Sequence, residues 1–307
     1  MAAIEIDGLT KDYGDVLAAD DLTFQVDTGE VFGYLGPNGA GKTTTIRLLM
    51  GFISPTAGDA TVLGRSIHDR TALKDARRHI GYLSDEPGFD EEATGREIID
   101  LHAAVKGDTR SEQLLTQFDP PVNRRIREYS RGNVQKLGLV TTFMHEPDLV
   151  ILDEPTSGLD PLMKRRFAEF LREERERGVA VFLSSHILGE VRRLCDRVGI
   201  LRGGRLVTVE PIESLLRRSG KVVRIDSASP IPIDALDVDG VYDLESSLVD
   251  GEDEDPERVF TECAFTFTGD INALVSVLPE RELLDLSIEE APLEDVFLRF
   301  YGGDDDV

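Results

Sequence analysis

Residues 36–43 read GPNGAGKT and match the pattern GxxxxGK[ST]. The apolar run VFGYL (31–35) precedes this stretch, and TTTIRLLM (43–50), whose apolar spacing suits a helix, follows it. In a loop between strand and helix, the three glycines let backbone N–H groups turn toward phosphate oxygens, and the positive end of the helix assists them. The residues expected to contact nucleotide phosphates are Gly36, Pro37, Asn38, Gly39, Ala40, Gly41, Lys42, Thr43 and Thr44.

The last residues of this loop carry its chemistry. Lys42 is placed to reach the outer phosphates, and the Thr43 hydroxyl is placed to ligate magnesium. A glycine-rich turn without a ligand would not explain the lysine and the threonine together. The loop therefore predicts a site for a nucleotide and Mg²⁺, and by itself it leaves kinases, GTPases and motor proteins open.

A second acidic element narrows the choice. The run LVILDEP (149–155) has the composition of a buried strand that ends in two acids. A carboxylate at a strand end beside a phosphate loop can hold a magnesium-bound water, and Asp153 suits that role. Glu154 is then the candidate general base, a role worth roughly 10² to 10⁴ in rate. Without the phosphate loop, two acids that merely end a strand would be the simpler interpretation.

The order of elements predicts an α/β protein with two domains. Short β-type runs alternate with helical patterns after residue 40, which indicates a P-loop NTPase core with a parallel sheet, preceded by an N-terminal antiparallel β subdomain. Residues from about 88 to 147 lack strand patterns and predict a helical insertion. The composition changes near residue 219, so we expect a domain with the phosphate loop over 1–219 and a small α+β accessory domain over 220–307, with a solvated acidic loop at 251–257.

Charge and composition exclude several classes of function. The 307 residues contain 59 acids against 34 bases, a net charge of −25 that repels nucleic acids, so we expect no nucleic-acid partner. No apolar run approaches the roughly 18 residues of a membrane-spanning helix, and no signal peptide pattern opens the chain, which favours the cytoplasm. Two cysteines are too few for a disulfide framework or a zinc site. Only seven of the basic residues are lysines, a pattern that resembles proteins of salt-loving organisms; an ordinary acidic bacterial protein is the alternative.

Four motifs in order carry a family resemblance: GPNGAGKTT, YSRGNVQ, LVILDEPTSGLDP and SSH. Together they resemble the ATPase subunit of an ATP-binding cassette (ABC) transporter, over residues 1 to about 219. The resemblance implies that Tyr13 stacks on adenine, although an exposed tyrosine at a strand end would look the same in sequence. It also implies that Asp160 lies in a loop crossing a dimer interface, and that His186 contacts the outer phosphate and orients the attacking water. The other histidines are expected to be surface or packing residues: His68, His79, His102 and His145.

The segment YSRGN (129–133) takes the place of the family's LSGGQ signature. Ser130 and Gly132 are retained and offer a hydroxyl and a helix N-terminus to a terminal phosphate. Arg131 and Asn133 depart from the pattern, and Arg131 is open to two interpretations, phosphate contact or exposure to solvent. In the family the signature of one subunit closes on the nucleotide of the other, which implies a second copy of the chain around two Mg-ATP.

The stretch GYLSDEPG (81–88) holds a further departure. In the family a glutamine after this strand touches magnesium and the attacking water and leads toward the membrane partner. By register Asp85 takes its position, with Glu86 as the other candidate. A carboxylate still ligates magnesium but cannot donate a hydrogen bond. We therefore expect Asp85 to be a magnesium ligand and the sensor between nucleotide and transporter.

The resemblance implies an ATP-hydrolysing subunit that drives a separate membrane permease from the cytoplasmic face of the membrane. Residues 287–303, SIEEAPLEDVFLRFYGG, resemble the accessory segment of drug and antibiotic exporters, which favours export. One alternative is a soluble ABC ATPase acting in DNA repair or on the ribosome. Another is a nucleotide-dependent regulator without turnover, suggested by the altered signature and by Asp85.

Overall fold

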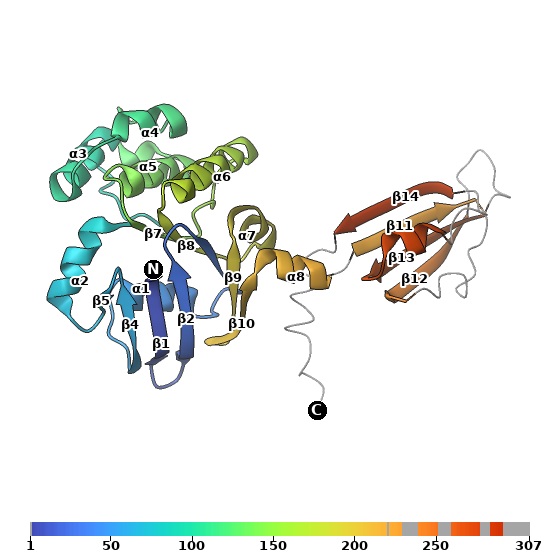
Figure 1. Ribbon diagram of the computed structural model, residues 1–307. Coiled ribbons are helices and arrows are strands. Elements are labelled where there is room, and N and C mark those ends of the chain that lie inside the picture. Colours follow the sequence, from blue (N-terminus) through green and yellow to red (C-terminus); the bar gives the residue numbers. More distant parts are fainter. Residues whose placement is uncertain (1, 220, 229–238, 251–258, 277–282, 291–307) are drawn as a thin grey trace. The chain divides into compact units, whose positions relative to one another are not determined.

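The computed structural model describes residues 2–219, 221–228, 239–250, 259–276 and 283–290 (Figure 1). The chain forms two compact units, Met1–Ile212 and Glu213–Val307, which are described separately. The division lies close to the expected boundary at residue 219. The acidic stretch 251–257 and the segment after residue 290 lie outside the described residues.

A six-stranded sheet with the order β10-β9-β3-β8-β7-β6 forms the centre of the first unit. The pairings among β9, β3, β8, β7 and β6 are parallel, and only edge strand β10 is antiparallel. The apolar runs at 31–35 and 149–153 are strands with those bounds, buried at every position, as both faces of a parallel sheet require. The strands are β3 (Val31–Leu35), β6 (Ile80–Leu83), β7 (Leu149–Asp153), β8 (Ala180–Ser185), β9 (Arg197–Arg202) and β10 (Arg205–Pro211).

An antiparallel sheet with the order β2-β1-β4-β5 forms the second layer, as the β-rich N-terminal portion predicts. Aromatic rings join the two sheets: Phe24 of the antiparallel sheet stacks on Phe32 of β3 with ring centroids 5.3 Å apart, and Phe32 lies 5.9 Å from Phe182 of β8. The strands are β1 (Ala2–Asp12), β2 (Leu17–Asp27), β4 (Ala57–Val62) and β5 (Arg65–Ser66).

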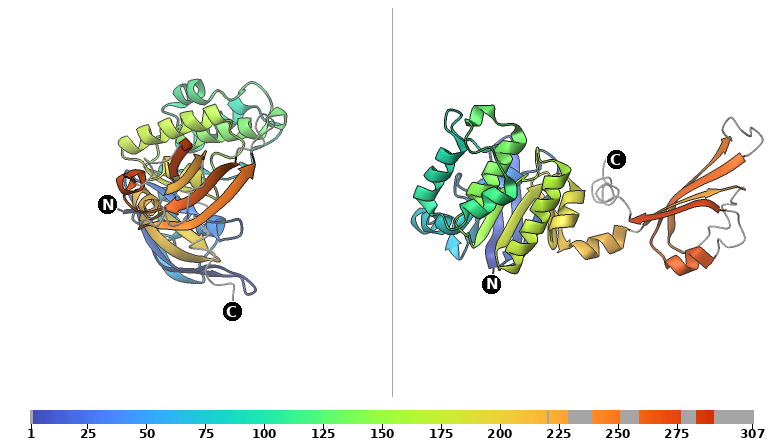
Figure 2. Two further views of the ribbon diagram at one scale, coloured as in Figure 1. Left: turned by 90° about the vertical axis from the view of Figure 1, so that its right-hand side faces the viewer. Right: turned by 90° about the horizontal axis from the view of Figure 1, so that it is seen from above.

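The predicted helical insertion is formed by α3, α4 and α5, which group together in every view (Figures 1 and 2). The Thr94 hydroxyl and the Glu97 carboxylate form a capping box at the start of α3. No helix among the described residues has the length and apolarity needed to cross a membrane. Helix α8 (Ile212–Ser219) begins at Ile212, the last residue of the first unit. The other helices of this unit are α1 (Lys42–Leu49), α2 (Arg70–Ala76), η1 (Arg77–His79), α3 (Gly95–Lys106), α4 (Ser111–Phe118), η2 (Ile126–Glu128), α5 (Arg131–Phe143), α6 (Pro161–Glu176) and α7 (Leu188–Leu194).

The second unit contains an antiparallel sheet with the order β12-β13-β11-β14. Alternate residues of β11 and β13 point to a small core that helix α9 completes through Leu274. The opposite face of the sheet is polar. Because the unit combines an antiparallel sheet with a helix, it is α+β. Its elements are β11 (Lys221–Ser227), β12 (Val241–Asp250), β13 (Val259–Phe267), α9 (Ile271–Ser276) and β14 (Leu283–Glu290).

Candidate functional site

The glycine-rich loop connects β3 to α1, as its sequence predicts. Two of its glycines are sterically required: a Cβ on Gly41, whose φ is +108°, would lie 2.0 Å from the Ala18 carbonyl oxygen, and one on Gly36 would lie 2.6 Å from that of Leu201. The Gly36 N–H donates to the Ser185 carbonyl at 3.3 Å, which ties the loop to the end of β8. The N-cap of α1 is Gly41, which has no side chain to cap the helix, so the first amides and the positive end of α1 face the loop and suit an anion.

Lys42 is folded into this loop and almost fully buried. Its Nζ donates to the carbonyl oxygens of Gly36 at 2.6 Å and Pro37 at 3.3 Å. The same Nζ lies 3.5 Å from Oε1 of Glu154. The lysine thus stands between the phosphate loop and the candidate general base.

Thr43 and Asp153 meet although 110 residues separate them in sequence. The Thr43 hydroxyl donates to Oδ2 of Asp153 at 2.9 Å, and the Ser184 hydroxyl donates to the other carboxylate oxygen. Mg²⁺ prefers hard oxygen ligands and uses one or two carboxylates together with substrate phosphates. A hydroxyl and a buried carboxylate in contact beside a phosphate loop fit that ion. Burial, and secondarily the charge of Asp153, raises the pKa of Tyr82 on neighbouring strand β6.

Glu154 follows Asp153 but has a different backbone conformation, with φ of +49° in the left-handed region. This turn takes the side chain out of the strand direction, and Oε2 lies 2.9 Å from Nδ1 of His186. Oε1 is buried and accepts no hydrogen bond from the described residues. A non-glycine residue held in this conformation is a constraint of the kind that gathers at functional sites. The structure thus brings Glu154 and His186 together.

The segment predicted as a signature forms the start of α5. Ser130 is the N-cap, and its hydroxyl accepts from the Asn133 N–H at 3.3 Å. Gly132 packs against Gly158, since a Cβ on Gly132 would lie 2.5 Å from the Gly158 carbonyl oxygen. Arg131 does not simply face solvent: its Nη2 lies 2.9 Å from Oδ1 of Asp85.

The remaining predicted residues lie at surface positions. Asp160 N-caps α6 by accepting from the Met163 N–H at 2.9 Å. Tyr13 is exposed in the loop between β1 and β2, with the Lys11 ammonium 5.0 Å from its ring centroid. An exposed ring is available for stacking. Near Glu86 the described contact is a main-chain one, in which the Ser84 hydroxyl donates to the Glu86 carbonyl.

Comparison with known proteins identifies the family. The sequence model of the family described as "ABC transporter" matches residues 19–157 of this chain. The bacitracin transport ATP-binding protein BcrA of Bacillus licheniformis is 31% identical, over 98% of this chain and 97% of its own length. The chain belongs to the ABC transporter family. A Nod factor export ATP-binding protein I of Neorhizobium galegae is 35% identical, over 98% of this chain and 85% of its own.

Solved structures agree with this assignment. The structure of the ATP-binding subunit of an ABC transporter superposes with a TM-score of 0.64 at 33% identity, over 70% of this chain and 92% of that one. A dimeric ATP-binding cassette bound to ADP and Pi has the same fold, with a TM-score of 0.63 at 20% identity, over 68% of this chain and 98% of that one. The protein is an ABC ATPase subunit related to ATP-binding proteins of export systems, with the α/β P-loop fold that the motifs predict.

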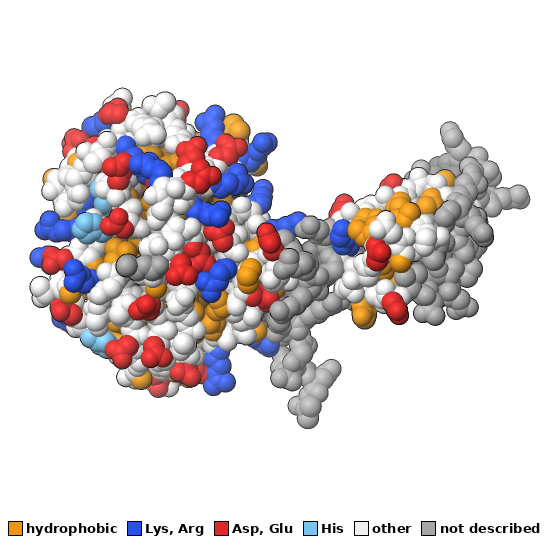
Figure 3. Space-filling model, in the orientation of Figure 1, with side chains coloured by type: hydrophobic (Ala, Val, Ile, Leu, Met, Phe, Trp, Pro, Cys, Tyr) orange, Lys and Arg blue, Asp and Glu red, His pale blue; other side chains and the backbone are white. Residues whose placement is uncertain are grey.

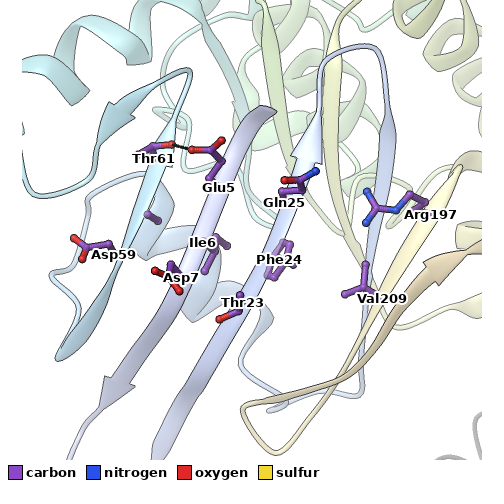
Figure 4. A pocket seen from close by; sticks show the side chains of 11 residues that line it. Glu5, Ile6, Asp7, Thr23, Phe24, Gln25, Asp59, Thr61, Arg197 and Val209 are labelled. Carbon is purple, nitrogen blue, oxygen red and sulfur yellow. Dashed lines mark hydrogen bonds between the residues drawn. The ribbon is translucent and has the colours of Figure 1, made fainter. Parts of the chain in front are cut away.

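One pocket of this ABC subunit lies apart from the predicted site. It opens over the antiparallel sheet and is lined by residues such as Glu5, Asp7 and Phe24, with Arg197 at one side (Figure 4). Its polar groups already have partners in part: Glu5 accepts from the Thr61 hydroxyl at 3.2 Å, and Arg197 pairs with Glu30 at 3.0 Å. No residue of the phosphate loop lines it, so it has no part in the nucleotide site.

Glu190, which no sequence pattern marked, supports the nucleotide site from behind. Glu190 of α7 is buried and accepts from the Thr156 hydroxyl, from Lys164 Nζ at 2.7 Å and from the Ser185 hydroxyl at 3.4 Å. It therefore ties the loop after Glu154 to the strand end before His186. A seven-residue helix is too short to show a periodic pattern that tells a buried glutamate from an exposed glutamate.

Proposed function

We propose that this subunit hydrolyses ATP as a pair of identical chains around two Mg-ATP, and that it drives a separate membrane permease from the cytoplasmic face. The observation that carries the proposal is the cluster of Lys42, Glu154 and His186 beside the contact of Thr43 with Asp153. A phosphate-binding lysine, a magnesium pair and a base oriented by an imidazole are the components that hydrolysis of a terminal phosphate requires.

Each side chain has a distinct task in this proposal. Lys42 Nζ leaves its carbonyl partners for the outer phosphate oxygens. Thr43 and Asp153 would hold Mg²⁺, the first directly and the second directly or through a bound water; the ion, when bound, neutralises charge on the phosphates. Glu154 accepts a proton from the attacking water, and His186 holds its carboxylate in place through the 2.9 Å contact. Asp85, or Glu86 beside it, takes the position of the family's glutamine.

The start of α5 supports the proposal that a second copy of the chain takes part. Ser130 and Gly132 present a capped helix N-terminus at the surface, which suits a phosphate bound to another chain. Asp160, at the start of α6, belongs to the same proposed interface, and Tyr13 is proposed to stack on adenine. A related cassette is dimeric in its solved structure with ADP and Pi.

The permease and the direction of transport are proposed from the relatives. Bacitracin transport and Nod factor export are the roles that their names give. Both match this chain along nearly its whole length, including residues after 219. Export of a substrate bound by separate membrane subunits is therefore the function that we assign. Neither of these names assigns a role in DNA repair or on the ribosome.

Replacement of Glu154 by Gln tests the assignment. We expect turnover to fall about 10²–10⁴-fold because the amide cannot take the proton, while ATP still binds. Light scattering should then detect a stable ATP-bound dimer of the variant. Glu146→Gln is the matched control, because Glu146 has a similar φ of +52° but lies in a surface ion pair with Arg177. A Glu154→Gln variant that hydrolyses ATP at the wild-type rate would overturn the role of Glu154.

We also propose that the surface is adapted to high salt. Its support is the net charge of −25 together with the shortage of lysine among the basic residues. Carboxylates hold water strongly, and high ionic strength screens their mutual repulsion.

A further inference from the structure

An ion pair joins two of the positions at which this chain departs from its family's motifs. Arg131 stands where the signature has glycine, and Asp85 stands where the loop after β6 has glutamine. Arg131 Nη2 lies 2.9 Å from Asp85 Oδ1, across 46 residues of sequence. Each substitution alone would add an unbalanced charge to its motif, and the ion pair balances the two charges.

The stem of Arg131 makes a second connection. A Cβ on Gly158 would lie 3.0 Å from Cγ of Arg131, so the arginine stem runs along the loop that leads to Asp160. Four residues farther along α5, the Gln135 side chain donates to the Pro155 carbonyl at 2.9 Å. One face of α5 is therefore attached to the segment that follows Glu154.

The same helix is packed against the loop that carries Asp85. A Cβ on Gly138 would lie 2.5 Å from Cδ1 of Leu83 and 3.4 Å from Cγ of Pro87, so the helix and the loop are in close contact. This packing brings the helix N-terminus to Asp85. Arg131 thus contacts two loops at once, one through its guanidinium group and one through its stem.

We propose that Arg131 is a positioning residue that holds Asp85 in place and couples it to the signature of the same chain. The inference rests on the proposed dimer, in which Asp85 serves the chain's own ATP while the signature serves the partner's. The Asp85–Arg131 pair then connects one ATP site to the other through a single chain. Both side chains are about half exposed, so the pair is weak and can exchange partners when phosphate arrives.

A double-mutant cycle tests this coupling. The variants are Asp85→Asn, Arg131→Gln and the double variant, with kcat, KM for ATP and the Hill coefficient measured at one salt concentration. Each single change should lower kcat about threefold to tenfold and reduce cooperativity, with KM nearly unchanged. The double variant should be no worse than the poorer single variant, because both remove the same interaction. If the losses of kcat in the two single variants multiply in the double variant, the proposal is overturned.

A second measurement does not depend on activity. Hydrogen exchange of the nucleotide-free full chain should become faster over residues 129–134 in Asp85→Asn and over residues 83–87 in Arg131→Gln. Arg96→Gln is the matched control, since it breaks a surface ion pair of the same length with Glu112 in the helical insertion, and it should change neither segment. If neither variant changes the exchange rate of the segment that carries the other residue of the pair, the proposal is overturned. Wild-type turnover and trapping by Glu154→Gln test the dimeric ATPase separately.

Discussion

Three basic side chains lie close together where β6 meets the helical insertion: His102, Lys106 and His145. Lys106 Nζ donates to the Ile80 carbonyl at 2.6 Å, and its charge disfavours protonation of both histidines. Burial is the largest cause for both histidines, and the pKa of His145 is lowered to about 4; burial also lowers the pKa of Lys106 to about 8. Packing, one of the two roles expected for these histidines, is what the structure shows, in a partly buried cluster.

This cluster predicts a loss of stability in mild acid. His145 is neutral in the folded state, whereas in the unfolded chain it takes up a proton as the pH falls below about 6.5. Between pH 6.5 and 4 the unfolded state therefore binds more protons than the folded state. The free energy of unfolding decreases as the pH is lowered through that window. In His145→Gln this fall should be smaller by about 1–2 kcal/mol, because one titrating group is gone. Denaturant unfolding at pH 7 and pH 4.5 measures it, and equal falls in both proteins would contradict it.

At the scale of elements, the sheet of the second unit carries three carboxylates side by side. Asp226 of β11 is directly opposite Glu262 of β13 and directly opposite Asp285 of β14. All three lie on the polar face, where alternation along each strand places them. Like charges directly opposite one another on neighbouring strands are destabilising.

Neutralising the central member should therefore stabilise this sheet. Asp226→Asn is expected to raise the free energy of unfolding of the second unit by about 0.2–1 kcal/mol in dilute salt, and less at 2 M KCl, where screening already weakens the repulsion. Glu245→Gln is the control, because Glu245 on the same face is opposite Ala264. Thermal unfolding of the full chain at both salt concentrations distinguishes them. An identical response of the two variants would show that the repulsion is negligible.

At the scale of the whole molecule, the net charge of −25 has to be tolerated by a folded chain. On the visible face of the first unit, acidic and basic side chains are interspersed (Figure 3). Several charged side chains of this unit form ion pairs, as Arg125 and Arg127 both do with Glu92. Such exposed pairs contribute little individually, so the excess of carboxylates remains a source of self-repulsion.

The stability of this molecule should therefore increase with salt. The screening length falls from about 10 Å at 0.1 M to about 3 Å at 1 M, which removes most repulsion between surface carboxylates. We expect the melting temperature to rise by about 5 °C or more between 0.1 and 2 M KCl. Differential scanning fluorimetry over a salt series measures it. A melting temperature that is flat or falling would oppose the proposed adaptation to salt.

The sequence by itself determined the features that depend on short stretches of chain. The phosphate loop, the strands at 31–35 and 149–153 and the helices of the insertion follow from glycine placement, apolar runs and helical spacing, which act over a few residues. The order of the motifs was enough to indicate the family and its ATPase fold. Lys42, Asp153 and Glu154 could be named because each has a fixed place next to such a stretch.

Only the tertiary structure decided which distant side chains meet. The partner of Arg131 was undetermined in sequence, because a contact across 46 residues depends on how the helical insertion returns to β6. Burial of Glu190 was equally hidden, since a short helix shows no pattern that tells which face packs inward. His186 could be placed at a strand end, but its 2.9 Å contact with Glu154 required the parallel pairing of β7 with β8. Backbone chemistry is local and leaves a readable pattern, whereas contacts between side chains depend on the path of the whole chain.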